Sequence, residues 1–365
     1  MKRPILPGCS ALAVLASACG SGVAAVNPFA YVTNNDLSSI SVFRIDPGSG
    51  GLTSVQTVAT PGGGATYGEV HPSGRFFFVS GQFSNVVSSY SIDAAGKLNL
   101  VDGGTLATGT NPHNLALDPE GRFLYVANTS SDTVSGFTVD ASGRLAAIAG
   151  SPFPTGHVPY DVKVAASGRF VYVTNRDSDD ISVLAIGAGT GALTPIANQP
   201  FHVACRTAPC GPRAIEFSPS GSRTFVANRF SGDVAVFDVD RASGALTAIQ
   251  GSPFAAGSDP RSLAVDPSGR YLYVPNVGSN DVSAYAIDEQ TGVLTRLTGS
   301  PYTAGTAPLS IEVDVSGRYA FVSNSGSNSV SVFRIERNTG RLASVATAPT
   351  AGSAFSVALG GAGGS

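Results

Sequence analysis

The sequence predicts an all-β protein, a seven-bladed β-propeller of four-stranded blades whose ring is closed by a C-terminal inner strand added to the first blade. The main observation is an internal repeat, because a short strand with an aromatic residue followed by Val occurs seven times. The copies are spaced 47, 47, 47, 53, 48 and 48 residues apart, and they lie at Tyr31-Val32, Phe78-Val79, Tyr125-Val126, Tyr172-Val173, Phe225-Val226, Tyr273-Val274 and Phe321-Val322.

Each repeat contains four segments that favour strands. The aromatic-Val strand is preceded by an alternating strand and a turn, such as Asp266-Pro267-Ser268-Gly269-Arg270. A second alternating strand follows, such as Val330-Ser331-Val332-Phe333, and a fourth comes after a Gly turn, as at Thr291-Gly292-Val293-Leu294. Hairpin turns and the lack of a helical period are typical of propeller blades.

The two ends of the repeat array complement each other. The first aromatic-Val strand, at residues 30–33, lacks the inner strand that precedes every later copy. Residues 355–359 align with the inner strand at 261–265, so the C-terminus can supply the missing strand and remove the open edges. We therefore expect the propeller to span residues 27–359, followed by a Gly-rich tail at 360–365.

Residues 1–26 have the composition of an export signal and a short linker. A basic Lys2-Arg3 pair precedes an apolar stretch from Ile5 to Ala18 and then Cys19. Ala16-Ser17-Ala18-Cys19 resembles a bacterial lipobox, which predicts lipidation of Cys19. The same small residues also suit ordinary signal peptidase. Both alternatives predict export to the periplasm or cell envelope, and the first adds a lipid anchor.

The one long repeat, of 53 residues, contains Cys205 and Cys210 in a short loop between blades. An oxidising compartment would join the two thiols in a disulfide. A zinc site would need further Cys or His ligands nearby. The acidic run at residues 177–180 is typical of a solvated turn, and no nucleotide-binding or zinc-protease motif is present. We expect no metal and no cofactor.

Composition limits the possible partners. The net charge is −3 and the only lysines are Lys2, Lys97 and Lys163, which leaves no basic surface for a phosphate backbone and predicts no nucleic-acid partner. No apolar run reaches the roughly 18–20 residues needed to span a bilayer, so membrane contact is expected only through the lipid anchor. We expect a monomer.

The inner strands predict a ring of mixed chemistry along the central channel. Aligned by the turn that follows each strand, the first position in the channel holds Thr66, His113, Tyr160, Arg213, Arg261, Leu309 and Phe355. Three residues later the equivalent position holds Glu69, Ala116, Lys163, Glu216, Ala264, Glu312 and Ala358. Charges in a channel can stay hydrated or pair with one another instead of being buried alone.

A family resemblance rests on two kinds of sequence motif. These are Tyr-Val-Thr-Asn, at residues 31–34 and 172–175, and the Asp-Pro-Ser-Gly-Arg turns. The sequence resembles the bacterial Tyr-Val-Thr-Asn propeller repeats and the lactonase-type seven-bladed propellers over residues 27–359. That second family includes propeller-type 6-phosphogluconolactonases and fungal carboxymuconate lactonising enzymes. The resemblance implies a propeller fold and, as an activity, the hydrolysis or formation of lactones.

The resemblance also implies four site positions at one mouth of the channel: a His, an Arg after Pro, a Glu after the repeated Asn, and a second Arg. Arg213 after Pro212 matches the first Arg. The other three positions hold Tyr160, Arg229 and Val277. The chain therefore keeps one of the family's four site residues.

Two hypotheses of function follow. In the first, the protein opens a lactone ring, with Arg213 holding an anion or oxyanion and Glu216 or His113 acting as base, because lactone opening needs a stabilised oxyanion and a deprotonated water. The remaining channel residues would bind substrate, namely Tyr160, Arg261, Arg229, Lys163, Glu69 and Glu312. In the second, these charges are structural ion pairs and the propeller is a non-catalytic scaffold that binds a glycan, a metabolite or another envelope protein.

Overall fold

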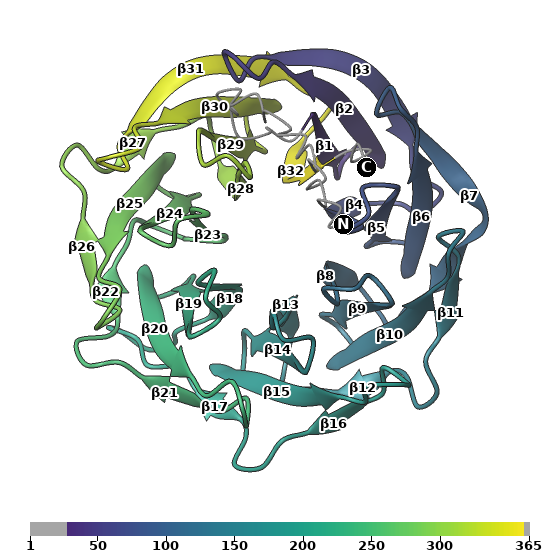
Figure 1. The fold of residues 1–365 in the computed structure, drawn as a ribbon, viewed down its shortest axis with the longest axis horizontal. Coiled ribbons are helices and arrows are strands. Elements are labelled where there is room, and N and C mark those ends of the chain that lie inside the picture. Colours follow the sequence, from purple (N-terminus) through teal and green to yellow (C-terminus); the bar gives the residue numbers. More distant parts are fainter. Residues whose placement is uncertain (1–27, 361–365) are drawn as a thin grey trace, which may run out of the picture.

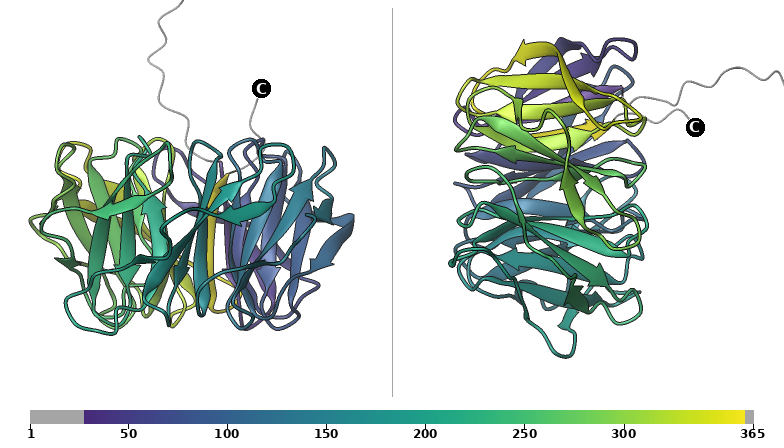
Figure 2. Two further views of the ribbon diagram at one scale, coloured as in Figure 1. Left: turned by 90° about the horizontal axis from the view of Figure 1, so that it is seen from below. Right: turned by 90° about the vertical axis from the view of Figure 1, so that its left-hand side faces the viewer.

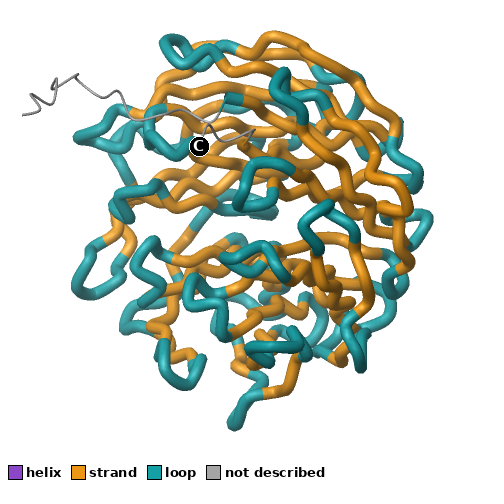
Figure 3. Tube along the Cα trace, turned by 45° about the vertical axis from the view of Figure 1, so that its right-hand side comes forward, coloured by secondary structure: helices purple, strands orange, loops and turns teal. Residues whose placement is uncertain are grey.

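The computed structural model describes residues 28–360, which form strands, turns and loops without a helix in that range (Figure 3). The strands make seven antiparallel sheets arranged as a ring about a central axis (Figure 1). Seen from the side, the ring is a short cylinder, and most of the turns lie on its two faces (Figure 2). The predicted seven-bladed propeller is confirmed.

Each blade contains one inner strand next to the axis and two strands behind it. The inner strands are β32 (Ala354–Gly360), β4 (Ala65–Val70), β8 (Pro112–Leu117), β13 (Pro159–Val164), β18 (Pro212–Phe217), β23 (Ala264–Val265) and β28 (Pro308–Val313). The second strands are β1 (Phe29–Asn34), β5 (Phe76–Gly81), β9 (Phe123–Asn128), β14 (Phe170–Asn175), β19 (Arg223–Asn228), β24 (Tyr271–Asn276) and β29 (Tyr319–Asn324). The third strands are β2 (Ser39–Ile45), β6 (Val86–Ile92), β10 (Thr133–Val139), β15 (Asp180–Ile186), β20 (Asp233–Val239), β25 (Asp281–Ile287) and β30 (Ser329–Ile335).

The outer strands differ between blades. They are continuous in three blades, as β3 (Leu52–Ala59), β7 (Leu98–Ala107) and β31 (Leu342–Pro349). In the other four blades two short pieces pair with the same third strand. These pieces are β11 (Leu145–Ala147) with β12 (Phe153–Pro154), β16 (Leu193–Pro195) with β17 (Phe201–His202), β21 (Leu246–Ala248) with β22 (Phe254–Ala255), and β26 (Leu294–Arg296) with β27 (Tyr302–Thr303).

The second strands form the centre of the core because both of their faces pack against neighbouring blades. Six of the seven are buried along their whole length, which explains their nearly continuous apolar sequence. The Asn that ends most of them donates to the Ser two residues into the third strand, as between Asn175 Nδ2 and Ser182 Oγ at 2.9 Å. The repeated Asn and Ser residues are therefore a structural pair within the blade.

The ring closes between the two ends of the described chain. The inner strand β32 pairs antiparallel with β1, from Phe29 opposite Gly360 to Asn34 opposite Ala354. Thr33 Oγ1 and Ser356 Oγ lie 2.9 Å apart across this junction, and both side chains are buried. The predicted closure by the C-terminal strand is confirmed, and the strand includes Gly360.

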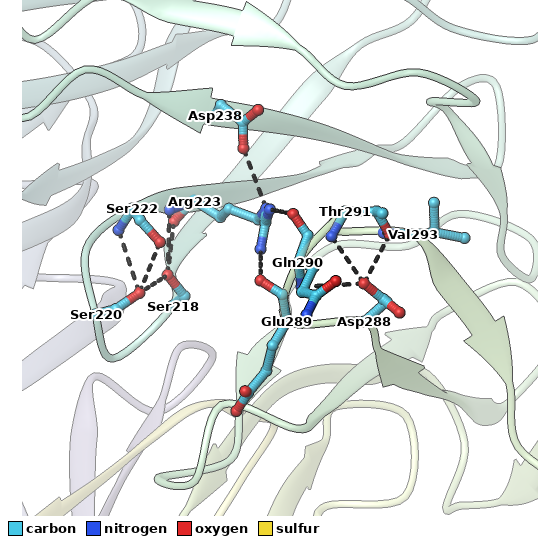
Figure 4. A network of polar contacts seen from close by, with 10 residues as sticks. All are labelled: Ser218, Ser220, Ser222, Arg223, Asp238, Asp288, Glu289, Gln290, Thr291 and Val293. Atoms are coloured by element: carbon cyan, nitrogen blue, oxygen red, sulfur yellow. Dashed lines mark hydrogen bonds and ion pairs between the residues drawn. The ribbon is translucent and has the colours of Figure 1, made fainter.

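Arginines that follow the turn between the inner and second strands bind the neighbouring blade. Arg223 donates from Nε to Asp238 in its own blade at 3.1 Å, and its two terminal nitrogens donate to the carbonyls of Glu289 and Gln290 in the following blade (Figure 4). Arg270 reaches the carbonyl of Arg337 in the same way, at 2.7 Å. These contacts hold neighbouring blades in a fixed orientation and so fix the width of the channel.

Residues 28–360 contain no helix of the length and apolar character that a membrane crossing requires. The predicted export signal at residues 1–26 and the predicted lipidation site Cys19 lie outside the described residues.

Candidate functional site: a polar cavity on the propeller axis

A cavity of about 300 Å³ lies on the axis, enclosed by the inner strands. Polar and charged side chains predominate in its lining, which places it among the small-ligand sites that proteins build from a few convergent polar groups. One end is aromatic and cationic, and we call it the arginine end: Tyr67, His113, Tyr160 and Arg213. The other is the acidic end: Glu69, Asp161, Lys163, Glu216 and Glu312.

β-Bulges aim the arginine-end side chains at the axis. In β13 the pairing with β14 steps from Pro159 directly to Asp161, which leaves Tyr160 as the extra residue. In β18 the pairing steps from Pro212 to Ala214, which leaves Arg213 in the equivalent place. A bulge of this kind bends the strand and redirects one side chain. The residue after Pro therefore points into the channel.

Tyr160 contacts both His113 and Arg213. The Arg213 guanidinium lies 3.9 Å from the centre of the Tyr160 ring, a cation–π distance, and the His113 ring lies 3.9 Å from it in an edge arrangement. Tyr67 and Phe355 pack on the far side of His113, with ring centres 5.0 and 5.6 Å away. The three predicted residues His113, Tyr160 and Arg213 are thus one contiguous group.

Two side chains at the arginine end are buried with nitrogens that lack a well-formed hydrogen bond. Nε of Arg213 is unpaired, and His113 has only a contact with the Tyr160 backbone, which favours the protonated ring; the two side chains are 3% and 2% exposed. Burial, followed by the charges of Arg213 and Arg261, lowers the pKa of His113 well below its usual range. The imidazole is therefore neutral at pH 7 and keeps one nitrogen free to accept a proton.

One lysine balances the acidic end. Lys163 Nζ lies 3.0 Å from Glu216 Oε2, and within the described chain this is its single ion pair shorter than 4.0 Å. Burial alone would lower the pKa of Lys163, but the carboxylates of Glu216, Asp161, Glu312 and Glu69 together raise it well above its usual range. The lysine stays charged and is the centre of this cluster.

Three of the four carboxyl groups retain protons near neutral pH. Burial raises the pKa of Glu69 to about 8 and those of Asp161 and Glu312 to about 7, and the charge of Lys163 offsets only part of this effect. The mutual repulsion of Glu69, Glu216 and Glu312 acts in the same direction as burial for Glu69. The acidic end therefore exchanges protons in the pH range in which proteins usually work.

Two predicted binding residues lie outside the cavity lining. Arg229 Nε and Arg261 Nε each lie 2.9 Å from Asp259 Oδ1, and Arg261 Nη2 lies 2.6 Å from Asp259 Oδ2. Arg229 and Asp259 line a separate surface depression with Phe230 and Ser258. Both arginines share one aspartate, so one positive charge remains, and the charge of Arg261 lowers the pKa of His113.

The structure adds residues that the sequence analysis missed. Tyr67 lines the cavity, whereas the sequence predicted its neighbour Thr66. The bulge in β4 places both residues opposite Ser80, and the Thr66 hydroxyl lies 2.7 Å from the Ser80 hydroxyl. Asp161 accepts from Asn114 Nδ2 and from the Ile215 amide, at 2.9 Å for the latter. Asn114 and Asp161 occupy equivalent positions in neighbouring repeats, and this equivalence could have predicted from the sequence that the two side chains lie close together.

The predicted disulfide between Cys205 and Cys210 is present, with an S–S distance of 2.07 Å. Its loop connects β17 to β18 and ends immediately before Pro212 and Arg213. Asp179 accepts from the amides of Cys210 and Gly211 at 3.2 and 2.8 Å. This loop therefore fixes the backbone that leads into the strand carrying Arg213.

No group of three or more His, Cys, Asp or Glu side chains within residues 28–360 is arranged to hold a metal ion. The acidic-end carboxylates come from four different blades, on β4, β13, β18 and β28, and face one another across the channel.

Fold and cavity together define a closed seven-bladed propeller with a polar, ligand-sized site on its axis. The chain belongs to the family described as lactonase, 7-bladed beta-propeller, whose model matches residues 23–157, 144–257, 211–307 and 253–359. No curated protein matches the sequence significantly.

Solved structures share the fold at low sequence identity. A Bacteroides fragilis protein assigned as a 6-phosphogluconolactonase is 21% identical with a TM-score of 0.81, covering 90% of this chain and 96% of its own. A Bacteroides uniformis protein with the same assignment is 22% identical with a TM-score of 0.81, covering 90% and 98%. The periplasmic gluconolactonase of Pseudomonas aeruginosa is 23% identical with a TM-score of 0.75, covering 90% and 98%.

We predict that Glu69→Gln removes a pH-dependent cost to stability. Because the pKa of Glu69 is about 8 in the folded protein and near 4.5 without its surroundings, the native state binds more protons between these pH values, and the free energy of unfolding falls as pH rises. Glutamine cannot ionise. In urea unfolding, the free energy of unfolding of the variant should therefore rise relative to that of wild type by at least about 1 kcal/mol between pH 5 and pH 8.5. This lower bound is smaller than the free energy that corresponds to a shift of one pKa unit.

The matched control is Glu289→Gln, which changes an exposed carboxylate on the outer face. Its stability relative to wild type should not vary over the same pH range. A constant difference between Glu69→Gln and wild type at all pH values would contradict the prediction.

Proposed function

We propose that the protein hydrolyses a lactone in the axial cavity. The observation that carries this proposal is the pair of buried side chains, His113 and Arg213, that have nitrogens without a well-formed hydrogen bond and meet on Tyr160. Of the ten described residues with a buried, unpaired side-chain atom, these are the two that line the axial cavity, where a substrate can complete the hydrogen bonds. Membership of the lactonase propeller family favours an ester ring as that substrate.

The residues divide the chemistry between them. Neutral His113 takes a proton from a water molecule as that water attacks the lactone carbonyl carbon. Arg213 donates to the oxyanion that forms on the carbonyl oxygen. When the tetrahedral intermediate collapses, the ring C–O bond breaks, and the leaving alkoxide takes the proton back from His113. The products are one hydroxyl and one carboxylic acid, which releases its proton to solvent at neutral pH, and Arg213 then faces the resulting carboxylate.

Other groups have positioning roles in this proposal. Tyr160 holds the Arg213 guanidinium over its ring and contacts His113 at the same time. Glu216 is held by Lys163 and accepts from the Phe217 amide at 3.0 Å, so it is less available as a base than His113. We therefore assign the base to His113, one of the two candidates that the sequence indicated.

Hydrolysis of a panel of lactones should be detectable and should depend on both groups. His113→Gln is expected to lower kcat by about 10²–10⁴-fold, the usual contribution of a general base. Arg213→Ala is expected to lower it by about 10²–10³-fold, as for the loss of one oxyanion donor. The assay follows acid release from gluconolactone, its 6-phosphate and aromatic lactones, after subtraction of spontaneous hydrolysis.

Two exposed residues provide controls, His157→Gln and Arg241→Ala, since both side chains lie outside the cavity lining. Their activity should equal that of wild type. Absence of turnover with every lactone in the panel would overturn the proposal and favour the binding-scaffold hypothesis.

The pH profile gives a separate test of the base. His113 must be neutral to accept a proton, and its pKa lies well below the usual 6.5, so kcat at saturating gluconolactone should stay level as pH falls from 8 through 6.5, whereas KM can vary with the protonation of the acidic end. Activity should be lost only at more acidic pH, as the imidazole gains its proton. An acid limb centred at or above pH 6.5 in a stopped-flow pH series would exclude His113 in this environment.

We also propose that residues 1–26 direct export and that Cys19 carries a lipid in the periplasm or cell envelope. The disulfide between Cys205 and Cys210 supports an oxidising compartment. Expressed in a bacterial host, the mature protein should begin at Cys19 with an added acyl mass and fractionate with membranes. A freely soluble periplasmic chain would favour ordinary signal peptidase, and an uncleaved cytoplasmic chain would refute export.

A further inference from the structure

The acidic end of the cavity contains more carboxyl groups than cations. Four carboxyl groups face a single ammonium, and Lys163 forms its close ion pair with Glu216. Both oxygens of Asp161 are already used, by Asn114 and by the Ile215 amide. Glu69 and Glu312 thus line the cavity beyond ion-pair distance of Lys163, and among the described residues no second cation lines this end.

The arginine end supplies an independent sign that the cavity receives a ligand. His113 and Arg213 line the same space, are buried to more than nine-tenths and have nitrogens without a well-formed hydrogen bond. Arg213 and Glu216 lie three residues apart on β18, which corresponds to roughly 10 Å along a strand. One small molecule can therefore reach both ends, and the two ends favour opposite charges.

An organic ammonium group has the chemistry that fits the acidic end. It offers three N–H donors and a full positive charge, and charge-assisted hydrogen bonds to carboxylates are stronger than neutral ones. Carboxyl groups that hold protons in the empty cavity would ionise as the ammonium enters, so binding and proton release are linked. A phosphate would be repelled by each of these carboxyl groups that is ionised and would favour their protonated forms instead, which is the opposite of what an ammonium does.

We propose that Glu69 and Glu312 form a binding site for a protonated amine, so that the substrate class is a small lactone bearing an ammonium group. The lactone part of this inference rests on the proposed hydrolysis. The site for the amine itself depends only on the geometry of the acidic end. The hydrolysis product would be a zwitterion, with its carboxylate at Arg213 and its ammonium at Glu69 and Glu312.

Binding of stable sugars tests the amine site without any hydrolysis. Glucosamine, glucose and glucose 6-phosphate differ in charge and cannot be opened as lactones. By isothermal titration of the mature protein at pH 7, glucosamine should bind at least about tenfold more tightly than glucose, a difference of about 1.4 kcal/mol. Glucose 6-phosphate has its counter-charge at Arg213, so its affinity should not depend on Glu312. Titrations in buffers of different ionisation enthalpy should show that glucosamine releases protons.

Variants should move the affinity in opposite directions. Glu312→Gln removes a carboxylate and should weaken glucosamine binding about tenfold, whereas Glu312→Asp, which keeps the charge, should retain most of it. Lys163→Gln removes the competing ammonium and should tighten binding. Glu289→Gln on the outer face should leave the affinity unchanged, and melting temperatures establish that each variant is folded.

The outcomes separate this inference from the proposed activity. If glucosamine binds as expected but no lactone is hydrolysed, the amine site stands and the activity fails. If gluconolactone is hydrolysed while glucosamine and glucose bind equally, or Glu312→Gln has no effect on affinity, the amine site is refuted and the activity stands. When both hold, an amino-substituted lactone should be preferred over gluconolactone, and Glu312→Gln should abolish that preference.

Discussion

The pairing of β32 with β1 is the constraint on which the rest of the molecule depends. It joins residues 320 or more positions apart and makes the last inner strand part of the first blade. Because the seven sheets then form a closed ring, their inner strands must converge on one axis, and the cavity collects side chains from at least five blades. An open chain of the same blades would have no fixed distance between Glu69 and Glu312 across that axis.

The fold was predictable because the same sequence motifs recur in successive blades. The aromatic-Val strands and the Asn and Ser residues recur in nearly every blade, so each copy supports the interpretation of the others, and the closing strand follows from a missing segment at one end. The first channel residue after Pro was also predictable, since Tyr160 and Arg213 follow the same Pro in neighbouring repeats and share the same bulge. Repetition thus gave both topology and the direction of these side chains.

The polar contacts of the site were not predictable, because they depend on distances between blades and on local irregularities. The bulge in β4 covers two residues, and as a result Tyr67 lines the cavity where the sequence predicted Thr66. Arg261 follows Pro260 as Arg213 follows Pro212, yet its guanidinium turns back to Asp259, two residues earlier in the chain. Sequence spacing gives the position of such a side chain but not the partner that it selects.

The channel keeps two opposite electrostatic environments in one small space. Burial and then the nearby arginines disfavour a proton on His113, while burial and mutual repulsion favour protons on Glu69 and Glu312. These effects coexist because roughly three strand residues separate the ends, and because the low dielectric of the interior strengthens each local field. A molecule with an electron-rich carbonyl at one end and a positive group at the other gains from both fields. A molecule of reversed or uniformly negative charge is opposed by at least one of them.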